Sequence, residues 1–143
     1  MSLNAITGII GIDHVGIAVP ELSNALAFYQ STFNARLLHQ EENVEQGVVE
    51  AMLAIGTDSP TVIQLLAPLT SDSTIATFID RHGPGMQQLA FRVKDVREAA
   101  RQAQALGIRA LYDQPKRGTK GALINFLHPK DCGGVLIELI EGQ

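Results

Sequence analysis

One pattern of strands occurs twice along the chain, and this repeat restricts the possible folds more than any other feature. Residues 12–19 (IDHVGIAV) align with residues 86–93 (MQQLAFRV) at an offset of 74 positions, which sets position 88 against position 14. The same offset aligns VVEAML with ALINFL, and VIQLL with LIELI, without a gap. Three matches at one offset predict two copies of one supersecondary unit.

Each copy is predicted to have the order βαβββ, which gives an α+β fold class. Both begin with an alternating strand that leads into an amphipathic helical stretch, ELSNALAFYQSTF in the first half and DVREAARQAQALG in the second. Three further strands follow in each half. The predicted strands are 12–19, 35–40, 47–55 and 61–66 in the first half, and 86–93, 109–113, 121–127 and 134–140 in the second.

The two helices are predicted to turn their apolar residues toward the strands. Ser23 is the expected N-cap of the first helix. Gly107 is expected to end the second, because glycine readily adopts the left-handed conformation that follows many helices. The expected inward residues are Leu22, Leu26, Phe28 and Phe33 in the first helix, and Val96, Ala99, Ala100, Ala103 and Leu106 in the second.

The halves are expected to form a single domain over residues 10–141. Repeat one covers about 10–67 and repeat two about 85–141, and a chain of 143 residues is the size of one ordinary domain. The connection at 68–84 carries prolines and glycines and a predicted short helix around STIATFIDRH. It links the halves and does not need a core of its own.

The composition argues against several classes of protein. A net charge of −4 disfavours nucleic acid as the main partner. The single cysteine, Cys132, excludes an internal disulfide and a four-cysteine zinc site. The apolar runs are too short to cross a membrane. The start, MSLNAITGII, lacks the basic region and long apolar core of a signal peptide, so a cytoplasmic location is expected.

Strand alternation places a set of polar side chains on one face of the predicted strands. If Val15, Ile17 and Val19 pack under the helices, then His14 faces the other side, together with small residues. Adjacent residues of a strand point to opposite faces, so Gln87 and Gln88 separate in the same way. The polar residues expected on the face away from the helices are His14, Glu50, Gln64, Gln88 and Glu138.

Burying these groups without partners would cost several kcal/mol each. An imidazole, two amide oxygens and a carboxylate could instead surround a divalent metal ion. Simpler interpretations stay open. Gln64 and Glu138 could be a polar pair at a strand edge. Gln88 could hydrogen-bond Gln64 or a substrate, and Glu50 could be a solvated residue of an acidic strand.

Several segments resemble the vicinal oxygen chelate superfamily, namely DHVGIAV followed by an amphipathic helix, and ELI near the C-terminus. Within it, EQGVVEAML, IQLLAPL, DSTIATFI and INFLHPKDCGGVLIEL are similar to the methylmalonyl-CoA epimerase family, and the resemblance covers about residue 10 to residue 141. It implies two tandem βαβββ modules that form an open, cup-shaped mixed sheet around a metal (the glyoxalase fold), and a homodimer.

The resemblance also implies roles for individual residues. His14, Gln64 and Glu138 match metal ligands. Glu50 matches a proton-transfer residue, a role implied for Glu138 as well. The fourth ligand is commonly part of a His-His pair where this chain has Gln87-Gln88, and Gln88 is interpreted as a ligand through its side-chain oxygen.

The implied reaction interconverts (2R)- and (2S)-methylmalonyl-CoA through an enolate that the metal stabilises. A glutamine in place of a histidine makes the ligand set richer in oxygen, which favours cobalt(II), with manganese(II), nickel(II), magnesium or zinc as alternatives. Two other functions stay open, a glyoxalase-type isomerase acting on a glutathione hemithioacetal and a metal-free binding protein of the same fold. The basic turn QPKRGTKG could contact CoA phosphates or be a solvated hairpin.

Overall fold

The computed structural model describes residues 5–58 and 61–142, and the chain divides into two compact units. The N-half unit consists of His14–Gln87. The C-half unit combines the described residues up to Asp13 with those from Gln88 onward. The first four residues of the segment considered for a signal peptide lie outside the described residues, and the domain limits at 10 and 141 stay a prediction.

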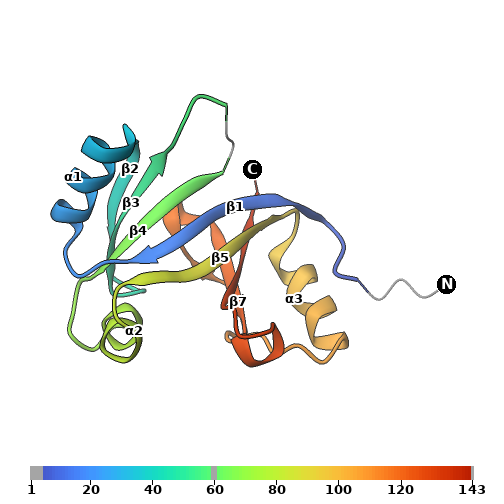
Figure 1. Ribbon diagram of the computed structural model, residues 1–143. Coiled ribbons are helices and arrows are strands. Elements are labelled where there is room, and N and C mark those ends of the chain that lie inside the picture. The colour runs from blue at the N-terminus through green and yellow to red at the C-terminus, as the bar shows by residue number, and fades with distance from the viewer. Residues whose placement is uncertain (1–4, 59–60, 143) are drawn as a thin grey trace. The chain divides into compact units, whose positions relative to one another are not determined.

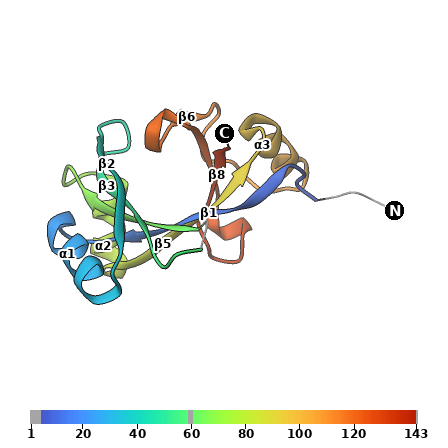
Figure 2. The ribbon, with the colours of Figure 1, turned by 90° about the horizontal axis from the view of Figure 1, so that it is seen from above.

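The strands of the N-half unit follow the order β2-β3-β4-β1. Strand β1 (Ile9–Ala18) runs parallel to β4 (Val62–Pro68), whereas β3 (Val48–Ala54) is antiparallel to both β4 and β2 (Arg36–Asn43). Helix α1 (Leu22–Phe33) connects β1 to β2 and lies along β3 and β4 (Figure 1). Figure 2 shows the hairpin of β2 and β3 from above.

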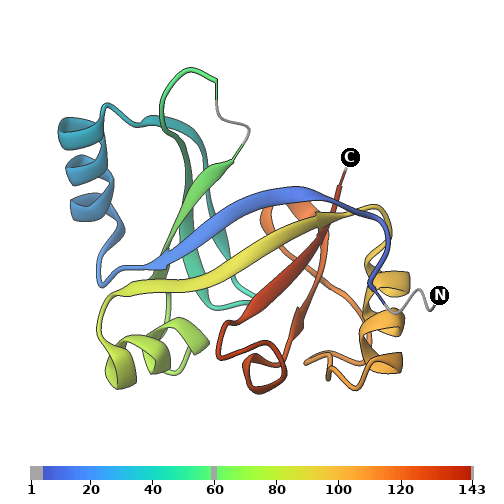
Figure 3. The same ribbon diagram turned by 45° about the vertical axis from the view of Figure 1, so that its right-hand side comes forward.

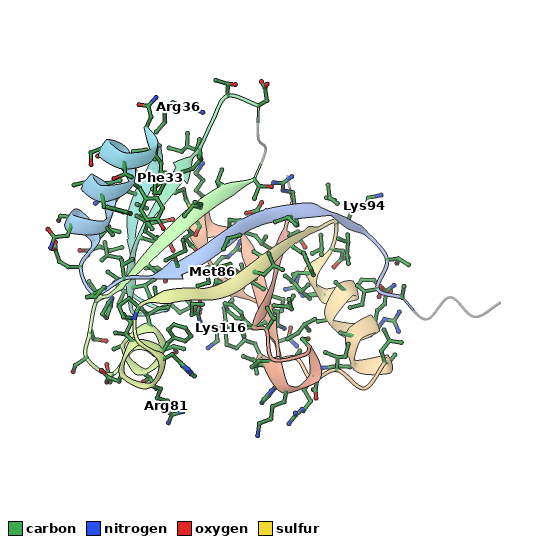
Figure 4. The ribbon with its side chains drawn as sticks, in the orientation of Figure 1. Phe33, Arg36, Arg81, Met86, Lys94 and Lys116 are labelled. Carbon is green, nitrogen blue, oxygen red and sulfur yellow. The ribbon has the colours of Figure 1, made fainter. Side chains whose placement is uncertain are left out.

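Helix α1 buries a different face from the predicted one. Phe28 and Phe33 are 54% and 50% exposed, so their assignment to the core was wrong. Phe33 is labelled at the end of α1 in Figure 4. The residues that pack against the strands follow the spacing i, i+3, i+4, i+7, which is one stripe of a helix. They are Leu22, Ala25, Leu26 and Tyr29, in contact with a core that includes Ala51, Leu53 and Leu65.

The N-terminal end of α1 also differs from expectation. Ser23 is not the N-cap, because the helix begins at Leu22 and Ser23 lies inside its first turn. The N-cap is Glu21, whose side chain makes no capping hydrogen bond. At the other end Asn34 takes the left-handed conformation with φ 55°, and its N–H donates to the carbonyl of Tyr29. Asparagine is among the few residues besides glycine that tolerate this conformation, so the helix ends without glycine.

The predicted short helix is present as α2 (Thr74–His82). Ser73 caps it by accepting a hydrogen bond from the N–H of Ala76 at 3.1 Å. Its apolar side, with Ile75, packs on Ala18, Val48 and Leu66, which lie on the face of the strands opposite α1. Helix α2 therefore covers one end of the face on which the polar residues were expected.

The C-half unit repeats the arrangement with the order β5-β8-β7-β6. Strand β5 (Gly85–Val93) is parallel to β8 (Ile137–Glu141), and β7 (Leu123–Leu127) is antiparallel to β8 and to the short β6 (Lys116–Arg117). Helix α3 (Val96–Ala105) packs against β7 and β8 (Figure 3). Its buried residues are Val96, Ala99, Ala100 and Ala103, as predicted, while Leu106 is 41% exposed at the C-cap.

The predicted strand at 109–113 is not formed. Only an isolated bridge joins Ala110 to Leu127, and the edge strand is β6, displaced toward the C-terminus. A tight turn follows β6, in which the N–H of Gly118 donates to the carbonyl of Ala122 at 2.8 Å. A Cβ at Gly118 would lie 2.8 Å from Cγ2 of Ile124, so this position has room only for glycine.

The predicted α+β class with the order βαβββ is confirmed in both units. Each has one parallel and two antiparallel strand pairings, as a mixed sheet requires. No helix within residues 5–58 and 61–142 is long and apolar enough to span a membrane.

Candidate functional site

In the N-half unit the polar residues lie on the strand face away from α1, as alternation predicted. His14 is 1% exposed, and Glu50 and Gln64 are also buried. The register sets Gly16 opposite Gln64 in the parallel pair β1–β4, so His14 is the diagonal neighbour of Gln64 on the same face. The residue of β1 directly opposite Gln64 is Gly16, which has no side chain beyond hydrogen.

Glu50 and Gln64 form a direct pair on this face. The side-chain nitrogen of Gln64 donates a hydrogen bond to Oε2 of Glu50 at 2.8 Å. Met52 lies opposite Gln64 in the β3–β4 ladder and is buried beside the pair. The bond fixes the carboxylate at a defined position, and it rules out the interpretation of Glu50 as a solvated strand residue.

The C-half unit carries an equivalent pair. The side-chain nitrogen of Gln88 donates to Oε1 of Glu138 at 2.6 Å, and both residues are buried. Ala90 is opposite Glu138 in the parallel ladder, so Gln88 and Glu138 are diagonal neighbours. Each unit therefore presents one buried carboxylate held by one glutamine amide.

The carboxylate and amide oxygens of these two pairs are donors of the kind that a hard divalent cation accepts. Among the described residues, 5–58 and 61–142, no group of three His, Cys, Asp or Glu side chains could hold a metal ion. A metal site built from this part of the chain must therefore use other donors as well. The amides of Gln64 and Gln88 direct nitrogen toward the carboxylates, and the same amides carry a neutral carbonyl oxygen, a ligand that hard cations accept.

Two aromatic side chains, Phe126 and Tyr112, form an apolar surface beside Glu138 that was not predicted from the sequence. Phe126 is opposite Glu138 in the β7–β8 ladder and is buried. The ring of Tyr112 meets the ring of Phe126 edge to face, with centroids 5.8 Å apart. Parity along the strand, which groups Phe126 with Ile124, could have placed Phe126 on this face. Tyr112 could not be placed, because it lies on a segment without strand pairing.

The other residues considered from the sequence lie outside these pairs. His128 accepts from the N–H of Lys130 in a turn, and Nε2 of His39 lies 3.0 Å from Oε1 of Glu41. Burial raises the pKa of the Cys132 thiol, which keeps the thiol protonated and agrees with an inert cysteine. Lys116, in the basic turn, lies over the ring of Tyr112, with its Nζ 4.2 Å from the centroid.

The chain belongs to the Glyoxalase/Bleomycin resistance protein/Dioxygenase superfamily, which it matches over residues 13–126. The expected superfamily is thereby confirmed. Among curated proteins it is 38% identical to the mitochondrial methylmalonyl-CoA epimerase of Homo sapiens over 129 residues, which is 90% of this chain and 72% of the human protein.

Solved structures of methylmalonyl-CoA epimerases are also similar to this chain. The methylmalonyl-CoA epimerase from Mycobacterium tuberculosis is 47% identical with a TM-score of 0.91, over 97% of this chain and 92% of that one. A methylmalonyl-CoA epimerase in complex with methylmalonyl-CoA and an ammonium ion is 42% identical with a TM-score of 0.89, over 94% of this chain and 95% of that one. The predicted resemblance to the epimerases is confirmed by these similarities.

Proposed function

We propose that this chain is a methylmalonyl-CoA epimerase, an isomerase that interconverts the (2R) and (2S) thioesters. The observation that supports it best is the presence of two buried carboxylates, Glu50 and Glu138, each held by a glutamine amide. Inversion at C2 requires removal of a proton on one side and delivery on the other. The similarity to epimerases of known substrate provides the substrate class.

We propose that His14, Gln64, Gln88 and Glu138 together bind one divalent metal ion. When bound, the ion supplies Lewis acidity toward the thioester oxygen and a fixed position for the substrate carboxylate. Three of the four ligands are neutral when His14 is neutral, so a dication keeps a net positive charge for an anionic substrate. Cobalt(II) is the favoured ion, with manganese(II), nickel(II), magnesium or zinc as alternatives.

Glu50 acts as the base that is not a ligand. Its carboxylate accepts from Gln64 through Oε2, which orients it, and it takes the proton from C2. Glu138 serves the opposite side, oriented by Gln88. A base at hydrogen-bond distance contributes roughly 10²–10⁴-fold to the rate. Both carboxylates are buried, which strengthens these interactions.

The deciding experiment is deuterium incorporation at C2 of methylmalonyl-CoA in D₂O, followed by proton NMR with and without added cobalt. We expect loss of the C2–H signal and appearance of both epimers, faster with cobalt. Absence of exchange with every metal would refute the proposed function. The hemithioacetal of glutathione is tested in parallel, and turnover of that compound alone would favour the glyoxalase-type reaction.

We propose further that the protein is a homodimer. Ile9, Ile10 and Ile12 of β1 are between 46% and 50% exposed, an unusual grouping of large apolar residues on one strand. Light scattering coupled to size exclusion should give twice the mass of 15.4 kDa. A mass of one chain at micromolar concentration would refute the dimer.

A further inference from the structure

Asn125 is a buried polar residue that the proposed mechanism does not use. It lies on β7 with 2% of its surface exposed, between the site-facing residues Ile124 and Phe126. Its side-chain oxygen accepts from the N–H of Tyr112 at 3.1 Å and from the N–H of Phe126 at 2.8 Å. Its side-chain nitrogen donates to the carbonyl of Tyr112 at 3.0 Å.

These bonds hold Tyr112 as a neighbouring strand would. Both main-chain groups of Tyr112 are bound by one side chain, in a segment where the strand predicted from the sequence is not formed. A buried amide with satisfied donors and acceptors is rigid, and removing it leaves main-chain groups without partners. Asn125 therefore fixes the path of the chain at Tyr112.

The path of the chain decides where the Tyr112 ring lies. The ring meets Phe126 at an interplanar angle of 86°, and the Nζ of Lys116 lies over it (Figure 4 labels Lys116). Phe126 and Tyr112 belong to one apolar cluster with Ala90, Ile124 and Ile140. Since Phe126 is opposite Glu138, the cluster borders the carboxylate.

We propose that Asn125 is a positioning residue that acts through Tyr112 and thereby limits the size of the alkyl group that the site accepts at C2. The inference rests on the proposed function, because Glu138 must lie close to C2 for proton transfer. The C2 substituent is then close to the apolar surface beside Glu138, which is Phe126 covered by Tyr112. Phe126 and Tyr112 cannot move away to admit a larger group without breaking the three hydrogen bonds that Asn125 makes to them.

The test compares methylmalonyl-CoA with ethylmalonyl-CoA, which adds one methylene. One methylene in an apolar pocket changes kcat/KM by about 10–200-fold. We expect Asn125→Ala to raise the ratio of kcat/KM for the ethyl over the methyl substrate by about tenfold. The ratio does not depend on the fraction of folded enzyme, so a loss of stability alone leaves it unchanged. Phe126→Leu, which enlarges the pocket directly, should shift the ratio in the same direction.

The position of Tyr112 can be observed separately. The chain has two tyrosines and no tryptophan, so in a Tyr29→Phe background Tyr112 is the only source of tyrosine near-ultraviolet circular dichroism. We expect Asn125→Ala to reduce this signal. Gln102→Ala is the matched control, since Gln102 also binds a distant main-chain N–H, that of Thr7 at 2.8 Å, but from α3. The control should change neither the signal nor the ratio.

The outcomes separate the inference from the proposed function. If the wild-type chain exchanges no deuterium, the function fails and the tyrosine signal still reports on Asn125. If the signal falls in Asn125→Ala while the ratio is unchanged, the inference is wrong and the function stands. If Asn125→Ala does not fold, Tyr112→Ala decides, because an unchanged ratio in that variant overturns the inference.

Discussion

The side-chain nitrogen of Gln88 lies 2.6 Å from Oε1 of Glu138, so the first strand and the last strand of the C-half unit meet in one amide–carboxylate pair. A histidine at position 88 would supply a more basic ligand but no amide oxygen. A glutamine can donate to the carboxylate through nitrogen and bind a cation through oxygen at the same time. Gln88 could therefore orient Glu138 and supply the proposed metal ligand with one side chain.

Gln88→Ala should weaken binding of the divalent ion. Loss of a residue that only orients a ligand typically lowers metal affinity about 10–100-fold, and loss of a ligand should lower it further. We expect a decrease above about 100-fold in a chelator competition with cobalt. Gln88→His, which keeps a ligand, should restore most of the affinity. Unchanged affinity in Gln88→Ala would remove Gln88 from the ligand set.

Glu50→Gln should abolish most of the exchange while the protein still binds metal. The neutral amide keeps the shape of the side chain and an oxygen that can accept from Gln64, but it cannot take a proton. We expect deuterium incorporation to fall about 10²–10⁴-fold, with metal content measured by mass spectrometry unchanged. Glu42→Gln, the same change at an exposed site on β2, is the control. Full activity in Glu50→Gln would exclude Glu50 as the base.

Leu65 and Leu139 occupy equivalent positions of the two repeats, and both are fully buried. Replacement of either by alanine should lower the free energy of unfolding by about 2–5 kcal/mol, because each leaves a cavity in its core. Phe33→Ala removes a larger side chain from an exposed position and should cost only about 1 kcal/mol, mainly from its ring contacts with Phe28 and Tyr29. Urea unfolding followed by far-ultraviolet circular dichroism measures all three. A larger loss for Phe33 than for the leucines would contradict the packing described here.

The ion pair of Asp131 with Arg109 should give a measurable pH dependence of stability. Hydrogen bonds from the Arg109 guanidinium and main-chain N–H lower the pKa of Asp131 from 3.8 to about 2. Because the pKa of Asp131 is lower in the folded state, its ionised form stabilises the protein at pH values above the unfolded-state pKa of 3.8. This contribution is lost as the pH falls toward about 2.

Asp131→Asn should therefore lower Tm at pH 7 and have little effect at pH 2. The difference should shrink in high salt, since the guanidinium is exposed. Asp80→Asn on α2 removes the same charge and serves as the control. A Tm difference for Asp131→Asn that stays constant between pH 7 and pH 2 would contradict the assignment.

The strands that carry the candidate site could be predicted because their side chains alternate strictly. Period-two alternation in DHVGIAV and in VIQLL fixes which residues share a face, and the repeat transfers the assignment to the second half. Burial of His14, Glu50, Gln64, Gln88 and Glu138 follows from this argument. The hydrogen bonds from Gln64 to Glu50 and from Gln88 to Glu138 could not be predicted, because they depend on the register between strands.

Two of the failed predictions have identifiable physical reasons. Phe28 and Phe33 were assigned inward, but the buried stripe of the helix has the regular spacing i, i+3, i+4, i+7, formed by Leu22, Ala25, Leu26 and Tyr29. The segment 109–113 has an apolar strand composition, but the Asn125 side chain binds the main chain at Tyr112 in place of a strand partner. Side chain to main chain bonds of this kind compete with regular pairing and leave no periodic signal.

The close approach of Gly118 to Ile124 has a consequence for how such a sequence can diversify. A Cβ at 118 would lie 2.8 Å from Cγ2 of Ile124, a buried, β-branched residue whose side-chain rotation is restricted, so Ile124 would have to shift. Replacement of Gly118 by a larger residue is therefore disfavoured until Ile124 has been replaced by a smaller one. Replacement of Ile124 by a smaller residue can come first, although it leaves a cavity. In a laboratory evolution experiment on this turn, changes at 124 should precede changes at 118 in every lineage that retains a folded protein.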